Sequence, residues 1–242
     1  MIVVTLIFGA IATFISFIYI EKIMPRLICT LIAGIILLGS VWGVVSNYHG
    51  HFGMYKVTTA TTQRVYSTDP TGKTQMLLFQ PIGTAGKENV YIYAKKAHAK
   101  KTSHTKADEY TNNKLTRTTN KKAYLKRTEV RWRYKSAAFK FWFGIAGNNN
   151  QLVKRTNRFY VPKTWFVLTV KQAKELKKQM SDQKRQAELK EQATIYVKGK
   201  MQAAIAKDPT LMTNTQQQKK LSQQFAAEYQ EKAMRELITE LK

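Results

Sequence analysis

The chain opens with two long apolar runs and is polar from there on. No charged residue occurs in residues 2–20 or in residues 27–46. A helix of about 20 residues spans the hydrocarbon core of a bilayer, where lipid offers the backbone no other hydrogen-bond partner. The pattern therefore predicts a membrane α-helical hairpin over residues 1–46, with helices at 2–20 and 27–46. The first run lacks a basic start and a small-residue cleavage site, which favours a retained helix over a signal peptide.

The middle of the chain alternates polar and apolar residues and is rich in β-branched residues, which favour strands. Strands are predicted over residues 55–66, 75–80, 89–94, 124–136, 139–145, 152–160 and 165–170. Turn signals occur at residues 68–72, at the loop of Pro81, Gly83 and Gly86, and at residues 147–150. Residues 95–122 are polar and leave a long hairpin and a loop of low order both open. The pattern predicts a small, mostly antiparallel all-β domain over residues 47–170, a sandwich or a barrel-like sheet.

The last part of the chain, residues 171–242, is rich in the helix formers Lys, Gln, Ala, Glu and Leu. Asp208-Pro209 interrupts it, because the residue before a proline disfavours the helical conformation. A C-terminal α-helical tail is predicted, with helices at 171–207 and 214–241. Apolar residues recur at every fourth position from Leu221 to Leu241, which predicts one apolar stripe. Packing within the chain and binding of a partner helix both remain open, and the lack of strict heptads disfavours a long coiled coil.

Charge narrows the range of partners. The chain carries 40 Lys or Arg against 15 Asp or Glu, and residues 47–170 alone hold 23 against 5, a net charge of 23 − 5 = +18. A field of this sign favours lipid head groups, anionic polymers or nucleic acid. Lys22 and Arg26 lie in the short loop between the two apolar runs, and such residues tend to stay in the cytoplasm. We therefore expect a multi-pass cell-membrane protein with both termini extracytoplasmic.

Two local patterns are candidate interaction sites. Alternation along residues 131–135 places Arg131, Arg133 and Lys135 on one face of a strand, as a candidate cationic surface, with the aromatic residues between them on the other face. Nucleic-acid binding is disfavoured, because stacking and charge would have to share a face. Gly39 and Gly43 form a small-xxx-small notch, a candidate helix-packing site. Packing between the two helices of the hairpin is favoured there over a dedicated partner surface.

The remaining motifs argue against a nucleotide-binding, metal-binding or catalytic site. Residues 67–74 end like a phosphate-binding loop, but Ser67 stands where the motif needs glycine and a strand is predicted to follow. His49 and His51 have no carboxylate or thiol close by in the sequence, too few ligands for a metal site. No catalytic, metal-binding or cofactor-binding residue is predicted, and no cofactor. An unrecognised cell-envelope enzyme, with His98 or His104 among its groups, stays an open alternative.

Several blocks of the middle region carry a family resemblance. They are residues 51–54 (HFGM), 78–83 (LFQPIG), 86–93 (GKENVYIY), 143–149 (FGIAGNN), 152–155 (LVKR), 159–163 (FYVPK) and Trp165. Together with the two helices they resemble an uncharacterised, domain-of-unknown-function family of membrane proteins from lactic acid bacteria, from the first helix to about residue 171. The family has no established activity, so no residue inherits a role. The resemblance implies a Gram-positive context in which members are often encoded beside a drug-efflux permease of the major facilitator type.

These observations together predict a membrane-anchored, non-enzymatic accessory protein. It would present a basic extracytoplasmic β domain to a partner, which the resemblance suggests is the efflux permease. The charge alone favours an alternative, a binder of anionic cell-wall polymer or of lipid head groups. An unrecognised cell-envelope enzyme is the second alternative.

Overall fold

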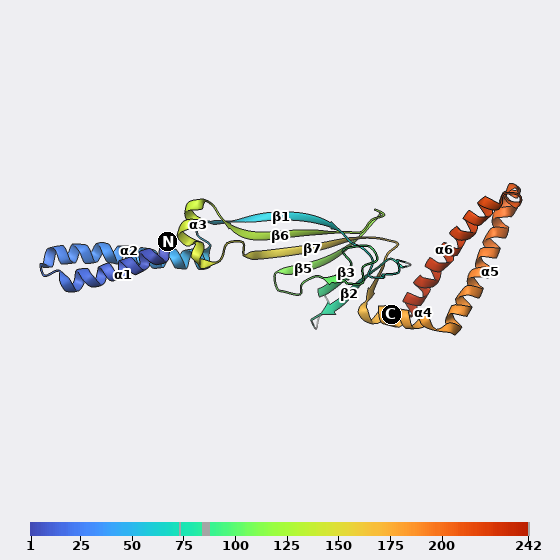
Figure 1. The fold of residues 1–242 in the computed structure, drawn as a ribbon, viewed down its shortest axis with the longest axis horizontal. Coiled ribbons are helices and arrows are strands. Elements are labelled where there is room, and N and C mark those ends of the chain that lie inside the picture. Colours follow the sequence, from blue (N-terminus) through green and yellow to red (C-terminus); the bar gives the residue numbers. More distant parts are fainter. Residues whose placement is uncertain (73, 84–87, 242) are drawn as a thin grey trace. The chain divides into compact units, whose positions relative to one another are not determined.

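The computed structural model describes residues 1–72, 74–83 and 88–241 (Figure 1). They cluster into two compact units. The first comprises Met1–Val65 and Thr105–Lys163, and the second comprises Tyr66–His104 and Thr164–Lys242. Lys73, Gly86 and the rest of the predicted loop at 84–87 lie outside the described residues.

The two apolar runs form helices α1 (Ile2–Tyr19) and α2 (Ile23–Gly50), as predicted. Both are long and apolar enough to cross a membrane. In the most apolar 18-residue stretch of each helix, only 11% of α1 and 17% of α2 is buried. Such outward-facing apolar side chains are unlike those of a soluble protein's core helix. α2 starts earlier than the predicted residue 27. Pro25 is compatible with this start because it lies in the first turn, where a missing N–H breaks no helical hydrogen bond. It ends at His51, whose left-handed backbone (φ 54°) caps it.

The two helices approach each other closely at Gly9. A Cβ built there would lie 3.0 Å from the Leu37 backbone nitrogen, tighter than nearly all real Cβ contacts, so a larger residue would push the two backbones apart by a few tenths of an ångström. The Ser40 hydroxyl donates to Thr5 Oγ1 at 3.1 Å, a polar link between the helices. Small residues at such contacts are typical of helices that pack within a bilayer.

The first unit contains an open four-stranded sheet in the order β1-β6-β7-β5. Its strands are β1 (Met54–Arg64), β5 (Thr111–Thr118), β6 (Tyr124–Tyr134) and β7 (Leu152–Pro162). β6 pairs antiparallel with β1 and β7, whereas β5 runs parallel to β7. β5 lies inside the polar stretch 95–122, whose state the sequence left open. A register shift interrupts the β6–β7 pairing between Val130 and Arg131.

The prediction of a strand over residues 139–145 is wrong, because this segment is helical. α3 (Ala137–Phe143) continues into the short 3-10 helix η1 (Gly144–Ala146). Ser136 caps α3 by accepting from the Phe139 backbone N–H. Phe139 and Phe143, one helical turn apart, pack into a cluster with Met54. Burial of this i, i+4 pair selects the helix over the strand.

The second unit holds a smaller sheet in the order β4-β3-β2-β8. Its strands are β2 (Met76–Ile82), β3 (Glu88–Tyr93), β4 (Ser103–His104) and β8 (Phe166–Thr169). β2 and β8 are parallel, and the other pairs are antiparallel. Pro81, predicted to lie in a loop, is inside β2 and pairs with Asn89. The described strands thus form two mixed sheets, and the predicted sandwich or barrel-like closure is not confirmed.

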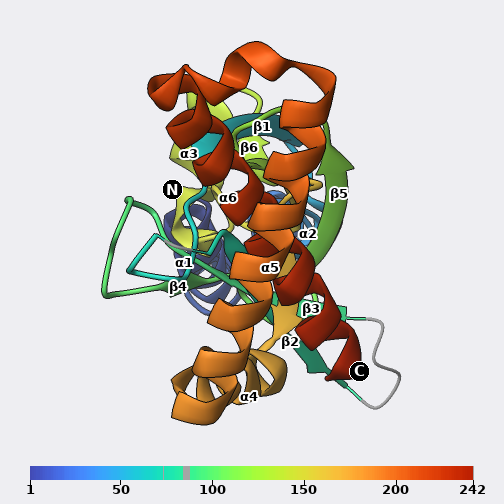
Figure 2. The same ribbon diagram turned by 90° about the vertical axis from the view of Figure 1, so that its right-hand side faces the viewer.

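The tail forms three long helices instead of the predicted two. They are α4 (Val170–Ser181), α5 (Gln183–Lys207) and α6 (Thr215–Glu240), with a short 3-10 helix η2 (Pro209–Met212) after the predicted break. The predicted helix 171–207 divides at Asp182, whose side chain caps α5 by accepting from the Lys184 N–H. α5 and α6 lie side by side (Figures 1 and 2). Leu168 of β8 packs with Leu176 of α4 and Leu237 of α6 in one buried cluster.

Candidate anion-binding face of the first sheet

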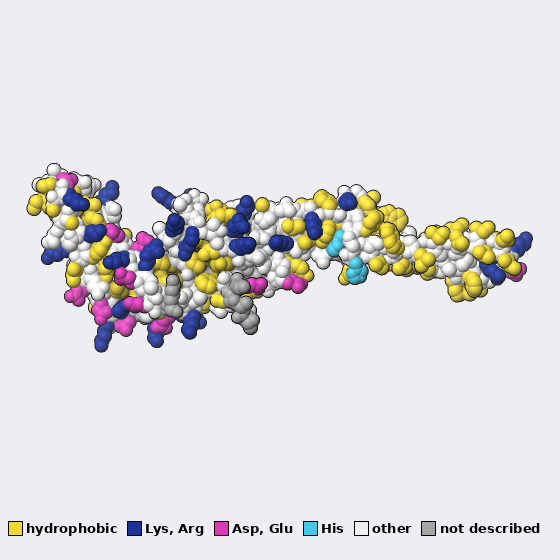
Figure 3. Space-filling model, turned by 180° about the vertical axis from the view of Figure 1, so that it is seen from behind, with side chains coloured by type: hydrophobic (Ala, Val, Ile, Leu, Met, Phe, Trp, Pro, Cys, Tyr) yellow, Lys and Arg dark blue, Asp and Glu magenta, His cyan; other side chains and the backbone are white. Residues whose placement is uncertain are grey.

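One face of the first sheet, termed here the basic face, collects cations without carboxylates. Cross-strand partners share a face and successive residues alternate between faces, so the register assigns each side chain. The cations of the basic face are Lys56, Arg64, Lys114, Lys126, Lys154 and Arg158. The one acidic residue in these four described strands is Glu129, on the opposite face. Lys and Arg side chains are spread over the strand region seen in Figure 3, whereas the surface of the hairpin is mainly hydrophobic.

Three of these cations, termed here the cationic row, lie on neighbouring strands. Arg158 of β7 pairs with Lys126 of β6 on one side and with Lys114 of β5 on the other. Directly opposed residues have Cβ atoms about 5 Å apart, and like charges placed so repel. All three residues are exposed, and none forms an ion pair with a carboxylate in the described part of the chain. The row is therefore a concentrated positive site that lacks an internal counter-charge there.

Aromatic and hydroxyl groups flank the cationic row along the strands. On one side the rings of Tyr124 and Tyr160 stack with centroids 4.7 Å apart. On the other side, two residues along the strands, Thr128 pairs with Thr156, which pairs in turn with Asn112. Hydroxyl and amide groups donate hydrogen bonds to anionic oxygens, and ring faces stack on flat or apolar groups of a ligand. The site can thus hold an anionic ligand by charge, hydrogen bonds and ring contact.

A second aromatic position lies farther along the basic face. Lys56 Nζ lies 5.1 Å from the centroid of the Trp132 ring, and the His51 ring stacks on the same ring at 4.1 Å. Trp132 is half-buried. Its ring therefore shares a face with Lys56 and lies on the side away from Arg131 and Arg133, as the alternation predicted. From the level of Lys56 to that of Arg64, a rise of about 3.3 Å per residue gives roughly 26 Å of strand.

The opposite face contains a carboxylate that pairs with two of its arginines. Glu129 accepts from Arg155 Nε at 2.7 Å and from Arg131 Nε at 2.8 Å. Burial alone would raise the pKa of Glu129, but the hydrogen bonds and charges of the two arginines outweigh it and lower the pKa below its usual range. Next to this triad, Arg127 donates to Asn157 Oδ1, and Asn157 donates to Asn113. The two faces of the sheet therefore differ in chemistry.

The predicted cationic surface lies on this opposite face and is only partly available. Arg131 binds Glu129 and the Asn150 carbonyl oxygen, the latter at 2.8 Å. Arg133 and Lys135 are exposed. Sequence reasoning missed the cationic row because its members come from three strands, and only the register brings them together.

The two glycines of the predicted notch, Gly39 and Gly43, lie in different environments. A Cβ built on Gly43 would meet Ile2 Cδ1 at 3.1 Å and Phe143 Cε1 at 3.5 Å, so this glycine lies in a packed site between the hairpin and α3. Gly39 has no atom near such a Cβ. The close helix contact is instead made by Gly9, which the sequence pattern did not single out.

A buried polar network joins the end of α2 to the sheet. Asn148 Nδ2 donates to the Asn47 side-chain and backbone oxygens at 3.0 and 3.2 Å. The Tyr134 hydroxyl lies 2.6 Å from Asn148 Oδ1 and 2.8 Å from the Phe143 carbonyl oxygen. Asn47 is fully buried, and it also donates to the Phe52 carbonyl oxygen at 2.7 Å. These bonds satisfy polar groups that would be costly to bury alone, and so tie the hairpin to the sheet.

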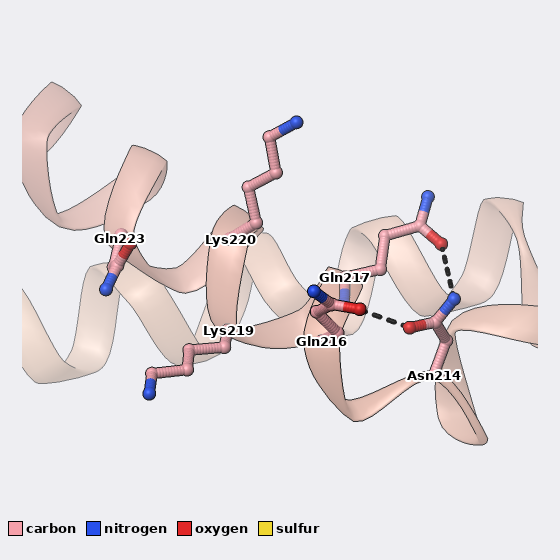
Figure 4. Close-up of a pocket in the computed structure, with 6 residues that line it drawn as sticks. All are labelled: Asn214, Gln216, Gln217, Lys219, Lys220 and Gln223. Atoms are coloured by element: carbon pink, nitrogen blue, oxygen red, sulfur yellow. Dashed lines mark hydrogen bonds between the residues drawn. The ribbon is translucent and has the colours of Figure 1, made fainter.

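The other hollows and histidines in the described part of the chain do not form a metal-binding or catalytic site. Among the described residues no three His, Cys, Asp or Glu side chains gather as a metal site. His98 Nδ1 lies 3.0 Å from the Pro70 carbonyl oxygen, and His104 lies in β4. A hollow at the start of α6 is lined by amides and two lysines, among them Asn214, which caps the helix (Figure 4). It contains no carboxylate, thiol or imidazole.

Comparison with known families assigns the chain to a group without an established activity. A family model described as "Domain of unknown function (DUF4811)" matches residues 22–176. The chain belongs to this family. The DUF4811 match covers α2, both sheets and the first part of α4, so it starts after α1, where the resemblance drawn from the sequence had included the first helix. No curated protein and no solved structure matched the chain.

Proposed function

We propose that this DUF4811 protein is a membrane-anchored, non-enzymatic binding protein whose basic face holds an anionic polymer of the cell envelope. The cationic row of Lys114, Lys126 and Arg158 carries the proposal. Three like charges on adjacent strands destabilise the sheet by themselves, and an anionic ligand would relieve that repulsion. The flanking Tyr124–Tyr160 stack would add contact area beside the charges.

An extended polymer fits the proposal better than a single small anion. The cations of the basic face are distributed along roughly 26 Å of strand, at a rise of about 3.3 Å per residue. A chain with repeated negative charges would meet several of them at once, and linked contacts bind more tightly than separate ones. Lipid head groups share the same phosphate chemistry and are the competing source of charge.

The arrangement proposed for the membrane has the turn between α1 and α2 inside the cell and both termini outside. Lys22 and Arg26 in or near that turn support it, by the tendency of such residues to remain cytoplasmic. The basic face would then meet wall polymers. The permease partner remains a prediction that rests on the family resemblance, and copurification with that permease would test it.

Retention on isolated wall polymer tests the proposed function. The full chain in mild detergent is passed over immobilised poly(glycerol phosphate), and over vesicles with anionic and with zwitterionic lipids. The triple variant K114Q/K126Q/R158Q is compared with a control that removes three exposed cations from the helical tail, K184Q/K190Q/K219Q. The two variants have the same net charge, so they separate the row from general electrostatics.

We expect the row variant to weaken polymer binding by about 5- to 150-fold, if each lost contact contributes roughly 0.3–1 kcal/mol. The control should change binding far less. Retention should also fall as salt rises from about 0.05 to 0.5 M, because the screening length shortens. Equal losses in the two variants would contradict a specific role for the row. Binding that requires anionic vesicles and ignores the polymer would assign the site to lipid head groups.

A further inference from the structure

We propose that the short helical segment of α3 and η1 inserts into the surface of the same bilayer that α1 and α2 enter. The inserting side chains are Phe141, Trp142 and Ile145, termed here the apolar ridge. This inference does not depend on the polymer-binding function, because the ridge and the cationic row share no residue. The occupant is the lipid of the bilayer.

The apolar ridge exposes an unusual amount of apolar surface for a water-facing segment. Phe141, Trp142 and Ile145 are 60%, 40% and 69% exposed. The same helix also has an inward side, where Phe139 and Phe143 pack on Met54. The segment therefore has one side satisfied by the protein and another that finds no partner within the described part of the chain. Contiguous exposed apolar side chains mark interaction surfaces.

The contacts of the segment identify lipid as the partner. The Met1 amine donates to the Phe141 and Trp142 carbonyl oxygens at 3.1 and 3.3 Å, which holds the ridge at the start of α1. Phe143 packs against Ile2 of α1 and lies beside Gly43 of α2. The ridge is thus continuous with the apolar outer surface of the hairpin, at the end where α1 begins. Lipid around that end of the hairpin would meet the ridge as well.

The residue types match the interface between lipid and water. Tryptophan is enriched there, because its ring is largely apolar and its N–H reaches polar groups. Lys140, on the same short helix, is exposed and long enough to place its ammonium group among phosphates while its stem covers apolar surface. Tyr48, near the end of α2, is 59% exposed and suits the same belt.

Spin-label accessibility in vesicles tests the proposal. In a C29A background, which removes the one native cysteine, single cysteines replace Phe141 or Ile145 and are labelled. A label at Ile11, in the middle of α1, gives the lipid reference, and a label at exposed Lys121, between β5 and β6, gives the aqueous reference. The full-length variants are reconstituted in vesicles of phosphatidylcholine and phosphatidylglycerol without added polymer. Collisions with oxygen, which concentrates in lipid, and with a water-soluble nickel chelate are measured at each site.

We expect labels at Phe141 and Ile145 to collide more with oxygen than with the nickel chelate, as the Ile11 label does, and the Lys121 label to show the reverse. Nickel accessibility at the ridge equal to that at Lys121 would overturn the proposal. Protection from both reagents would also overturn it, because it would mean that a second protein surface covers the ridge. Since no polymer is present, either outcome leaves the polymer-binding proposal untouched.

Discussion

The cationic row should cost the protein stability, and removing its centre should restore some. Arg158 has a cation directly opposite on each side, Lys114 on β5 and Lys126 on β6. If the side chains diverge so that the charges sit about 7 Å apart in water, each pair repels by about 0.6 kcal/mol. Two pairs give about 1.2 kcal/mol. Screening reduces this to about 0.9 kcal/mol at 0.01 M ionic strength and to about 0.5 kcal/mol at 0.15 M.

The variant R158T tests this repulsion against a matched control. Lys154 lies on the same strand and the same face, but its partner on β6 is Val130 and not a cation. K154T therefore removes a charge and adds a β-branched residue without relieving a charged pair. R158T should exceed K154T in stability by about 1 kcal/mol at low salt, which corresponds to roughly 2–4 °C in the unfolding temperature for a chain of this size.

The measurement is thermal unfolding of the full chain in mild detergent, followed by circular dichroism at low and at physiological salt. The advantage of R158T over K154T should shrink about twofold at the higher salt, because only the screened Coulomb part changes. R158T should also bind polyanion more weakly than wild type. An advantage that is absent at low salt, or that does not respond to salt, would refute the view that the row stores charge repulsion.

Three further substitutions test other contacts. E129Q should lower the free energy of unfolding by about 1–3 kcal/mol at pH 7, measured by urea unfolding, because it removes a charged hydrogen-bond acceptor. The folded-state pKa of Glu129 lies below the unfolded value of 4.5, so the wild-type protein should lose this extra stability as the pH falls below about 4.5. E129Q has no carboxylate at this position and should not show that pH-dependent loss. N148A should cost about 1–3 kcal/mol of stability in the same assay by leaving buried polar atoms unpaired, and N149A, outside that network, should cost much less. G9A should lower the SDS concentration at which the helical hairpin unfolds, because its Cβ would lie only 3.0 Å from the Leu37 backbone and force the helices slightly apart, while G34A, which faces open space, should leave it unchanged.

The elements that could be predicted from the sequence are those set by local pattern. Charge-free runs long enough for a bilayer defined α1 and α2, and alternation marked the long strands β1, β6 and β7. The helix breaker Pro209 located the boundary between α5 and α6. In each case neighbours in the chain supply the physical cause, so the printed sequence contains the information.

The misassigned elements depend on contacts between distant parts. Residues 139–145 contain an apolar residue at every second position and also a pair of phenylalanines at i and i+4, so strand and helix fit equally. Packing of Phe139 and Phe143 against Met54, far away in the chain, decides for the helix. The cationic row requires a parallel pairing of β5 with β7, and parallel strands are joined by long connections that local pattern does not reveal. The cationic row therefore could not be predicted by considering one strand at a time.

The difference between the two faces of the first sheet is the strongest reason to regard the basic face as a binding surface. A high net charge for solubility needs only exposed lysines, placed anywhere, and repulsion favours keeping them apart. On the opposite face of the described strands no cation stands directly opposite another, and Glu129 pairs with both Arg131 and Arg155. The basic face instead places Arg158 between two cations while threonines occupy the neighbouring positions, where a cation could have stood with less repulsion. An arrangement that raises the energy of the free protein is consistent with a bound state in which an anion lowers it.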